Sequence, residues 1–206
     1  TVLAHTMIGY KNQNKLYCEK TSGSTVIIDS YNPATDAYAS TVGTISDTAV
    51  TGKYPRPIIH PLDDTVYFFA GSTIAKLDGA TFTASAATIP AHLDIVSATD
   101  YGPFIAILCA PVDIGGKSVL FLWGRDTSIV EMDEAVDIGE GAGLVVENVQ
   151  GRLITISAPT TAAASAVDFY PTITFREYAG GQPNVVFELR WENTTAPTTV
   201  LLQNLK

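Results

Sequence analysis

The sequence predicts an all-β protein, a β-propeller built of four-stranded antiparallel blades. Three observations support this fold class. The β-branched residues Thr, Val and Ile make up 59 of the 206 residues, and they favour pleated strands. Short apolar runs bounded by Gly, Pro, Asn or Asp recur along the chain, whereas helical periodicity is almost absent. The same group of strands occurs four times, at the spacing typical of propeller blades.

One nearly unbroken apolar strand marks each of the four units. The equivalent positions Leu16, Val66, Ile105 and Leu153 lie 50, 39 and 48 residues apart. A strand with apolar side chains on both faces is covered on both faces. We therefore expect these strands to lie in the middle of stacked sheets.

A hairpin follows each apolar strand, and its turn residues support the assignment. Asp78-Gly79 and Gly180-Gly181 provide the positive φ of tight turns, and Asn32-Pro33 starts a turn because proline fixes φ. The run from 185 to 191 places Val185 on an apolar face opposite charged residues, which is typical of an edge strand. We place the blades near 1–47, 48–90, 91–139 and 140–197, with 198–206 as the start of a further blade.

The chain is expected to be a single segment, 1–206, of a larger propeller. It begins without Met and ends in the apolar run Val200-Leu201-Leu202. A β-sandwich or jelly roll is the alternative, because strand number alone does not separate it from a propeller, but the repeat favours the propeller. Cys18 and Cys109 lie in apolar segments and are expected to be buried free thiols.

Composition excludes some classes of partner. The net charge of −9 argues against binding to nucleic acid or to an anionic membrane surface. No apolar stretch is long enough to form a transmembrane helix, so membrane insertion is not predicted. The expected protein is soluble.

The sequence predicts no catalytic residue, no cofactor and no metal site. His5 and His60 could face a channel together with Asp94, but without metal-ligand spacing they are interpreted as channel-wall residues. The acidic run 131–140 is interpreted as a solvated outer strand and loop, and 139–143 as a link between blades. Because no nucleophile motif, carboxylate pair or arginine cluster stands out, the segment is predicted not to be an enzyme.

Two tryptophans are the candidates for a ligand contact. Trp123 and Trp191 lie in strands predicted as the third and fourth of their blades. Either indole could stack on a sugar ring, although packing between blades is the commoner use of such residues.

Parts of the chain resemble known propellers. The hairpin from Tyr31 to Tyr38 resembles that of kelch-type blades, without their recurring Gly-Gly doublet. The segments 120–126, 139–141 and 151–157, within 116–181, resemble divergent propellers in structural proteins of tailed bacteriophages. The second resemblance implies a virion component of a phage tail, neck or host-attachment apparatus.

Together these features give a function hypothesis. We expect a non-enzymatic structural and interaction protein of the virion, whose partners are other subunits of an oligomeric assembly. One alternative is a propeller module that binds a glycan or receptor on the host surface. A further alternative is the non-catalytic part of a propeller glycoside hydrolase.

Overall fold

The computed structural model describes residues 3–46, 55–112, 117–131, 135–140, 142–158, 172–179 and 182–190. In this part of the chain there are sixteen strands and one short 3-10 helix, η1 (Lys11–Gln13). The strands form four antiparallel sheets, each made of four strands in chain order. We call the sheets blades 1 to 4.

Consecutive strands build each blade. Blade 1 contains β1 (Leu3–Tyr10), β2 (Lys15–Ser22), β3 (Thr25–Asn32) and β4 (Ala37–Ser46). Blade 2 contains β5 (Ile58–His60), β6 (Thr65–Ala70), β7 (Thr73–Asp78) and β8 (Thr81–Thr88). Blade 3 contains β9 (Leu93–Tyr101), β10 (Phe104–Pro111), β11 (Lys117–Trp123) and β12 (Val136–Glu140). Blade 4 contains β13 (Ala142–Val149), β14 (Arg152–Ala158), β15 (Thr172–Ala179) and β16 (Gln182–Arg190).

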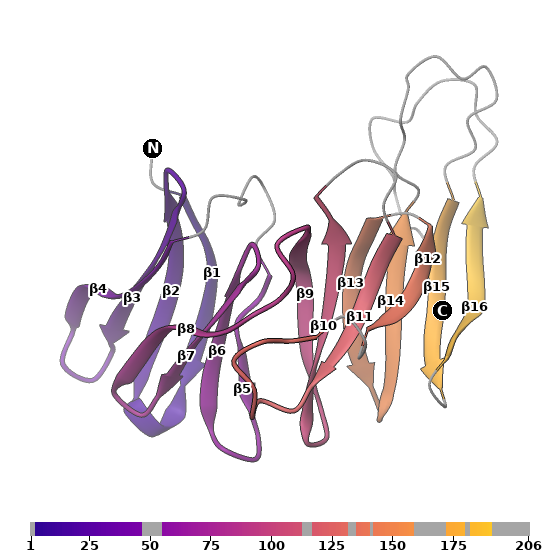
Figure 1. Ribbon diagram of the computed structural model, residues 1–206. Coiled ribbons are helices and arrows are strands. Elements are labelled where there is room, and N and C mark those ends of the chain that lie inside the picture. The colour runs from indigo at the N-terminus through magenta and orange to yellow at the C-terminus, as the bar shows by residue number, and fades with distance from the viewer. Residues whose placement is uncertain are drawn as a thin grey trace.

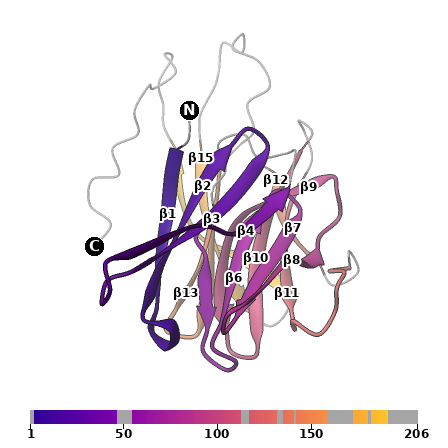
Figure 2. The ribbon, with the colours of Figure 1, turned by 90° about the vertical axis from the view of Figure 1, so that its left-hand side faces the viewer.

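The four blades stand side by side in chain order (Figure 1). Strand β5 contacts β9, and β9 contacts β13, so the first strands of blades 2, 3 and 4 are neighbours, while β4 of blade 1 contacts β8 of blade 2. Seen from the end, β1 and β13 lie on one side and β8 on the other (Figure 2). First strands line the axis of a propeller. This arrangement confirms the predicted fold class, and we call the side formed by the first strands the inner side.

Three apolar cores hold the blades together, one at each junction. The alternation of a strand sends neighbouring residues to opposite faces, so Phe68 packs towards blade 1 and Phe69 towards blade 3. All six residues of β6 are buried. The expectation that this apolar strand is covered on both faces is confirmed.

Turn chemistry agrees with the sequence where the turns are described. Gly79 has φ 55° in the tight turn between β7 and β8, a conformation that glycine adopts without strain. The Asn32 side chain accepts a hydrogen bond from the backbone N–H of Ala34 at 3.0 Å, which closes the turn before β4. Gly180 and Gly181 lie outside the described residues.

Two glycines mark places where neighbouring blades approach closely. A Cβ on Gly43 of β4 would lie 2.4 Å from the ring of Phe82 in β8. A Cβ on Gly143 of β13 would lie 2.9 Å from Leu108 Cγ in β10. Because real Cβ atoms do not approach carbon this closely, a side chain at either glycine would push two blades apart.

The edge strand of blade 4 differs from its predicted pattern. Val185 was expected on a buried face, but it is 55% exposed and its neighbour Val186 is 59% exposed. The pairing of β15 with β16 shifts register between Phe175 and Arg176, and this shift breaks the simple alternation. The segment 139–143 joins blade 3 to blade 4 as expected, but most of it belongs to the strands, since β12 ends at Glu140 and β13 begins at Ala142.

Both cysteines are free, as expected, with Cys109 buried and Cys18 half-buried. Among the described residues, the structure contains no helix with the length and apolar character needed to cross a membrane.

Candidate functional site

A polar hollow on the inner side is the candidate site. Its volume is about 290 Å³, close to the lower limit of small-molecule sites. The segment before β5 and the first strands of blades 3 and 4 form its wall. The lining residues are Pro55, Arg56, Val96, Ser97, Ala98, Leu144, Val145 and Glu147. We call this feature the inner hollow.

Arg56 presents a guanidinium group to the hollow from a stiff piece of backbone. It stands between Pro55 and Pro57, which are both buried, while Arg56 itself is exposed. Proline fixes φ, so the chain on either side of Arg56 has little freedom to move. In the described part of the chain, no hydrogen bond or ion pair engages the Arg56 side chain.

Glu147 brings a carboxylate to the hollow from another segment of the lining, strand β13. It lies in β13, paired in register with Ile154 of β14, and its side chain is exposed. Glu147 has no partner among the described residues either, and it does not form an ion pair with Arg56. The inner hollow therefore contains one cation and one anion that are both open to a ligand.

Ser97 joins the two strands that line the hollow, β9 of blade 3 and β13 of blade 4. Its hydroxyl accepts a hydrogen bond from the Val146 backbone N–H at 3.1 Å and donates to the Val146 carbonyl at 3.3 Å. Nearby, the Asn148 side-chain amide donates to the Asp100 carbonyl at 3.0 Å. These bonds between β9 and β13 set the spacing of the walls without using Arg56 or Glu147.

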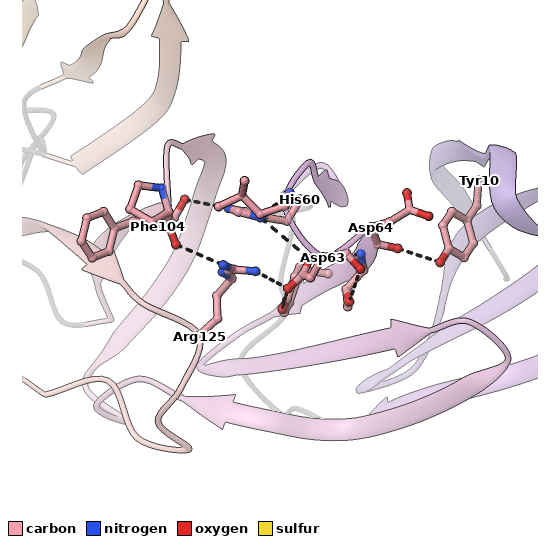
Figure 3. Close-up of polar contacts among 10 residues, drawn as sticks. Tyr10, His60, Asp63, Asp64, Phe104 and Arg125 are labelled. Atoms are coloured by element: carbon pink, nitrogen blue, oxygen red, sulfur yellow. Dashed lines mark hydrogen bonds and ion pairs between the residues drawn. The ribbon is translucent and has the colours of Figure 1, made fainter.

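A second polar cluster, at the turns between first and second strands, has a structural role (Figure 3). Arg125 forms an ion pair with Asp63 and donates to the Pro103 carbonyl at 3.2 Å. The Tyr10 hydroxyl donates to the Asp64 carbonyl at 2.6 Å. These contacts tie blades 1, 2 and 3 together, although Asp64 Oδ2 and Arg125 Nε are buried without a hydrogen-bond partner among the described residues.

His60 belongs to this second cluster and does not face an open channel. It is 0% exposed, and its Nε2 donates to the Phe104 carbonyl at 3.3 Å. Its Nδ1 accepts a hydrogen bond from the Leu62 N–H at 3.3 Å, so the proton sits on Nε2. The Nδ1 atom also lies 3.8 Å from Asp63 Oδ1. We assign the Leu62 N–H as the partner of Nδ1, because both ring nitrogens of His60 then have a hydrogen bond.

The other histidines and acids do not gather into a site in the described residues. The side chain of His5 lies outside them, and Asp94 is buried in β9. No group of three or more His, Cys, Asp or Glu side chains is placed to hold a metal ion in this part of the chain. Of the acidic run, Asp137 forms an ion pair with Lys117 at 2.7 Å on the edge of another cavity, of about 340 Å³.

The structure places Trp123 in the core between blades 2 and 3. It is 2% exposed, its Nε1 donates to the Thr127 carbonyl at 3.2 Å, and its ring meets Tyr67 edge-on at 5.7 Å. This placement leaves no open face for a sugar and matches the commoner use, packing between blades. Trp191 lies outside the described residues.

Sequence reasoning missed Arg56 and Glu147, the two charged groups of the inner hollow. Arg56 looked like one of five scattered arginines, and Glu147 like a residue of an ordinary strand. The Pro55-Arg56-Pro57 triplet was the available signal, because two prolines around one charged residue indicate a fixed display of that side chain.

Comparison with known proteins adds a fold relationship. No family model matches the sequence, and no curated protein matches it significantly. An exo-β-1,3-galactanase from Phanerochaete chrysosporium, solved with β-1,3-galactotriose, is similar with a TM-score of 0.59 and 11% identity. The same enzyme solved with galactose gives a TM-score of 0.58 and 11% identity. Each match covers 90% of this chain and 49% of the enzyme, so the chain spans about half the enzyme's length.

These matches correct one prediction and leave another without support. The prediction that the segment is not an enzyme is wrong, because the proteins that share its fold include a glycoside hydrolase. The lack of a catalytic motif in the sequence therefore did not exclude this class. Nothing in the comparisons supports a virion, phage or tail location, which stays a prediction. What the chain shares with the galactanase at 11% identity is the β-propeller fold.

Proposed function

We propose that this chain is part of a carbohydrate-active β-propeller and that it binds an oligosaccharide in the inner hollow. The observation that carries the proposal is the pair of unpartnered charged side chains, Arg56 and Glu147, in a hollow on the inner side. The galactanase with the same fold was solved with a galactotriose, which supports a sugar as the ligand class.

The lining has the chemistry that a sugar ring needs. A ring offers hydroxyl groups around its edge and C–H groups on its faces. Glu147 can accept hydrogen bonds from two hydroxyls, and Arg56 can donate to ring or hydroxyl oxygens. Val96 and Leu144 provide apolar surface for the C–H groups, and Leu144 is 44% exposed in the free protein.

Glu147 is also the first candidate for an acid or base. Glycoside hydrolysis uses two carboxyl groups on either side of the scissile bond. Within the described lining, Glu147 is the one carboxylate. We therefore propose oligosaccharide binding as the function, and hydrolysis is measured in the same experiment.

A binding screen with matched variants tests the proposal. The 206-residue chain is applied to an array of neutral and acidic oligosaccharides that includes β-1,3-galactotriose, and hits are measured by calorimetry. The site variant replaces Arg56 and Glu147 with Ala. The control replaces Arg152 and Glu177 with Ala, because this ion pair at 3.5 Å, formed by an exposed Arg152 and a half-buried Glu177, lies in blade 4 and does not line the hollow.

We expect at least one oligosaccharide to bind and the site variant to lose about tenfold or more in affinity, since two charge-assisted contacts are removed. The control should bind as the unmodified chain does. Binding that both variants retain equally would place the sugar elsewhere, and an array without hits would overturn the proposal. Release of reducing sugar that depends on Glu147 would extend it to hydrolysis.

A further inference from the structure

Among the described arginine side chains, Arg56 differs from the others in having no partner. The described part of the chain contains four arginine side chains. Arg125 pairs with Asp63, Arg152 pairs with Glu177, and Arg176 donates to the Ser157 hydroxyl at 2.6 Å. Arg56 alone of the four has neither an ion pair nor a hydrogen bond.

The lone guanidinium is notable because acids are abundant. The chain carries 21 Asp and Glu against 12 Lys and Arg, yet none of the described acids pairs with Arg56. Glu147 lines the same hollow and stays unpaired as well. Arg56 comes from the Pro55–Pro57 segment and Glu147 from β13, and the two side chains form no ion pair. A positive charge is thus held open where a ligand would enter.

We propose that the inner hollow binds an acidic oligosaccharide, in which the carboxylate of a uronic acid lies on Arg56 and ring hydroxyls donate to Glu147. This inference rests on the proposed function and specifies its ligand. A guanidinium presents parallel N–H donors that match the two oxygens of a carboxylate. In a uronic acid, the carboxylate and the free hydroxyls project from different edges of one ring. One sugar unit therefore satisfies both charged side chains.

A neutral sugar would satisfy only one of the two charged side chains of the inner hollow. Its hydroxyls can satisfy Glu147, but they leave the full charge of Arg56 without a counter-charge. A wholly anionic ligand such as free phosphate would meet Glu147 as a like charge. The combination of one cation and one anion fits a ring that carries one carboxylate and several hydroxyls.

Carboxyl reduction provides the matched ligands for a test. Uronic-acid oligosaccharides of several linkages are compared with the same compounds after their carboxylates are reduced to CH₂OH, which leaves the rest of each sugar intact. Affinities are measured by calorimetry at low and at high salt. The proteins are the unmodified chain, Arg56→Gln, Arg56→Lys and, as an arginine outside the hollow, Arg152→Gln.

We expect at least one acidic oligosaccharide to bind about tenfold to a hundredfold more tightly than its reduced form, as a charge-assisted bidentate contact implies. Arg56→Gln should abolish this preference, and Arg56→Lys should keep only part of it because an ammonium lacks the fork. Arg152→Gln should leave the preference unchanged. Added salt should weaken binding of the acidic form more than binding of the reduced form.

Several results would overturn the inference and separate it from the proposed function. Equal affinity for acidic and reduced forms would leave the oligosaccharide site standing and refute the carboxylate contact. A preference for sulfated over carboxylated sugars would refute the uronic acid and indicate that Arg56 binds a sulfate group instead. A preference that survives Arg56→Gln would place the anion site elsewhere. No binding to any sugar, neutral or acidic, would remove both proposals together.

Discussion

Replacing Gly143 with Ala should destabilise the junction between blades 3 and 4. The added Cβ would lie 2.9 Å from Leu108 Cγ and 3.0 Å from both of its δ carbons. Leu108 is 0% exposed and packs among Leu120 and Val146, so its side chain has no free space to enter. The Gly143 backbone is held too, because its N–H donates to the Ser118 hydroxyl at 2.6 Å.

The expected change in the free energy of unfolding is the sum of two opposing effects. Overpacking a well-filled core costs roughly 1–3 kcal/mol. Alanine also restricts the unfolded chain more than glycine does, and this raises the free energy of unfolding by about 0.4–1 kcal/mol. We therefore expect Gly143→Ala to lower the free energy of unfolding by about 1–2 kcal/mol, measured by urea denaturation followed by circular dichroism.

The matched control is Gly9→Ala in β1. The added Cβ there would lie 3.5 Å from Leu16 Cδ2, an ordinary contact. Its unfolding free energy should stay within about 0.5 kcal/mol of the unmodified protein, or rise. Adding Leu108→Val to Gly143→Ala should recover part of the loss, since it removes carbon atoms at the clash. Equal stability of the two glycine variants would refute the close approach of the blades.

Two further changes test particular side chains. Burial raises the pKa of Glu19 to about 7, and a hydrogen bond from Thr6 opposes this only in part. An unfolded Glu titrates near 4.5, so the contribution of a protonated Glu19 to stability should be fully present below about pH 4.5, and up to about 3 kcal/mol of it should be lost as the pH rises through 7. Glu19→Gln should remove this loss. The free energy of unfolding of both proteins is measured in urea at pH 4 and at pH 8, and an equal change between the two pH values in both proteins would contradict the prediction. Ser97→Ala leaves the N–H and carbonyl of Val146 without their partner and should cost about 1–3 kcal/mol, whereas Ser85→Ala at an exposed position should cost little. A loss of the same size for the two serine variants, in thermal melts, would argue against the link between β9 and β13.

Local signals predicted particular strands and turns. The apolar strand around Val66, the tight turn at Gly79 and the Asn32 turn are each determined by neighbouring residues, so the sequence alone indicates them. The edge strand was harder to predict, because the register shift in β16 depends on its pairing with β15, and Val185 and Val186 are both exposed.

The site depends on contacts between blades, which the sequence pattern does not contain. Arg56, Ser97 and Glu147 come from three different blades or their links and meet only when the first strands align. The burial of Trp123 also depends on a contact between blades. The alternation of its strand could not indicate that residues of blade 2 cover it.

The most direct test of the account is the binding of oligosaccharides to the 206-residue chain and to its Arg56→Ala, Glu147→Ala variant. We predict saturable binding of at least one sugar and a loss of about tenfold or more in the variant, with unchanged binding by the Arg152→Ala, Glu177→Ala control. Binding that is the same in all three proteins, or no binding to any sugar on the array, would contradict the claim that the inner hollow is an oligosaccharide site.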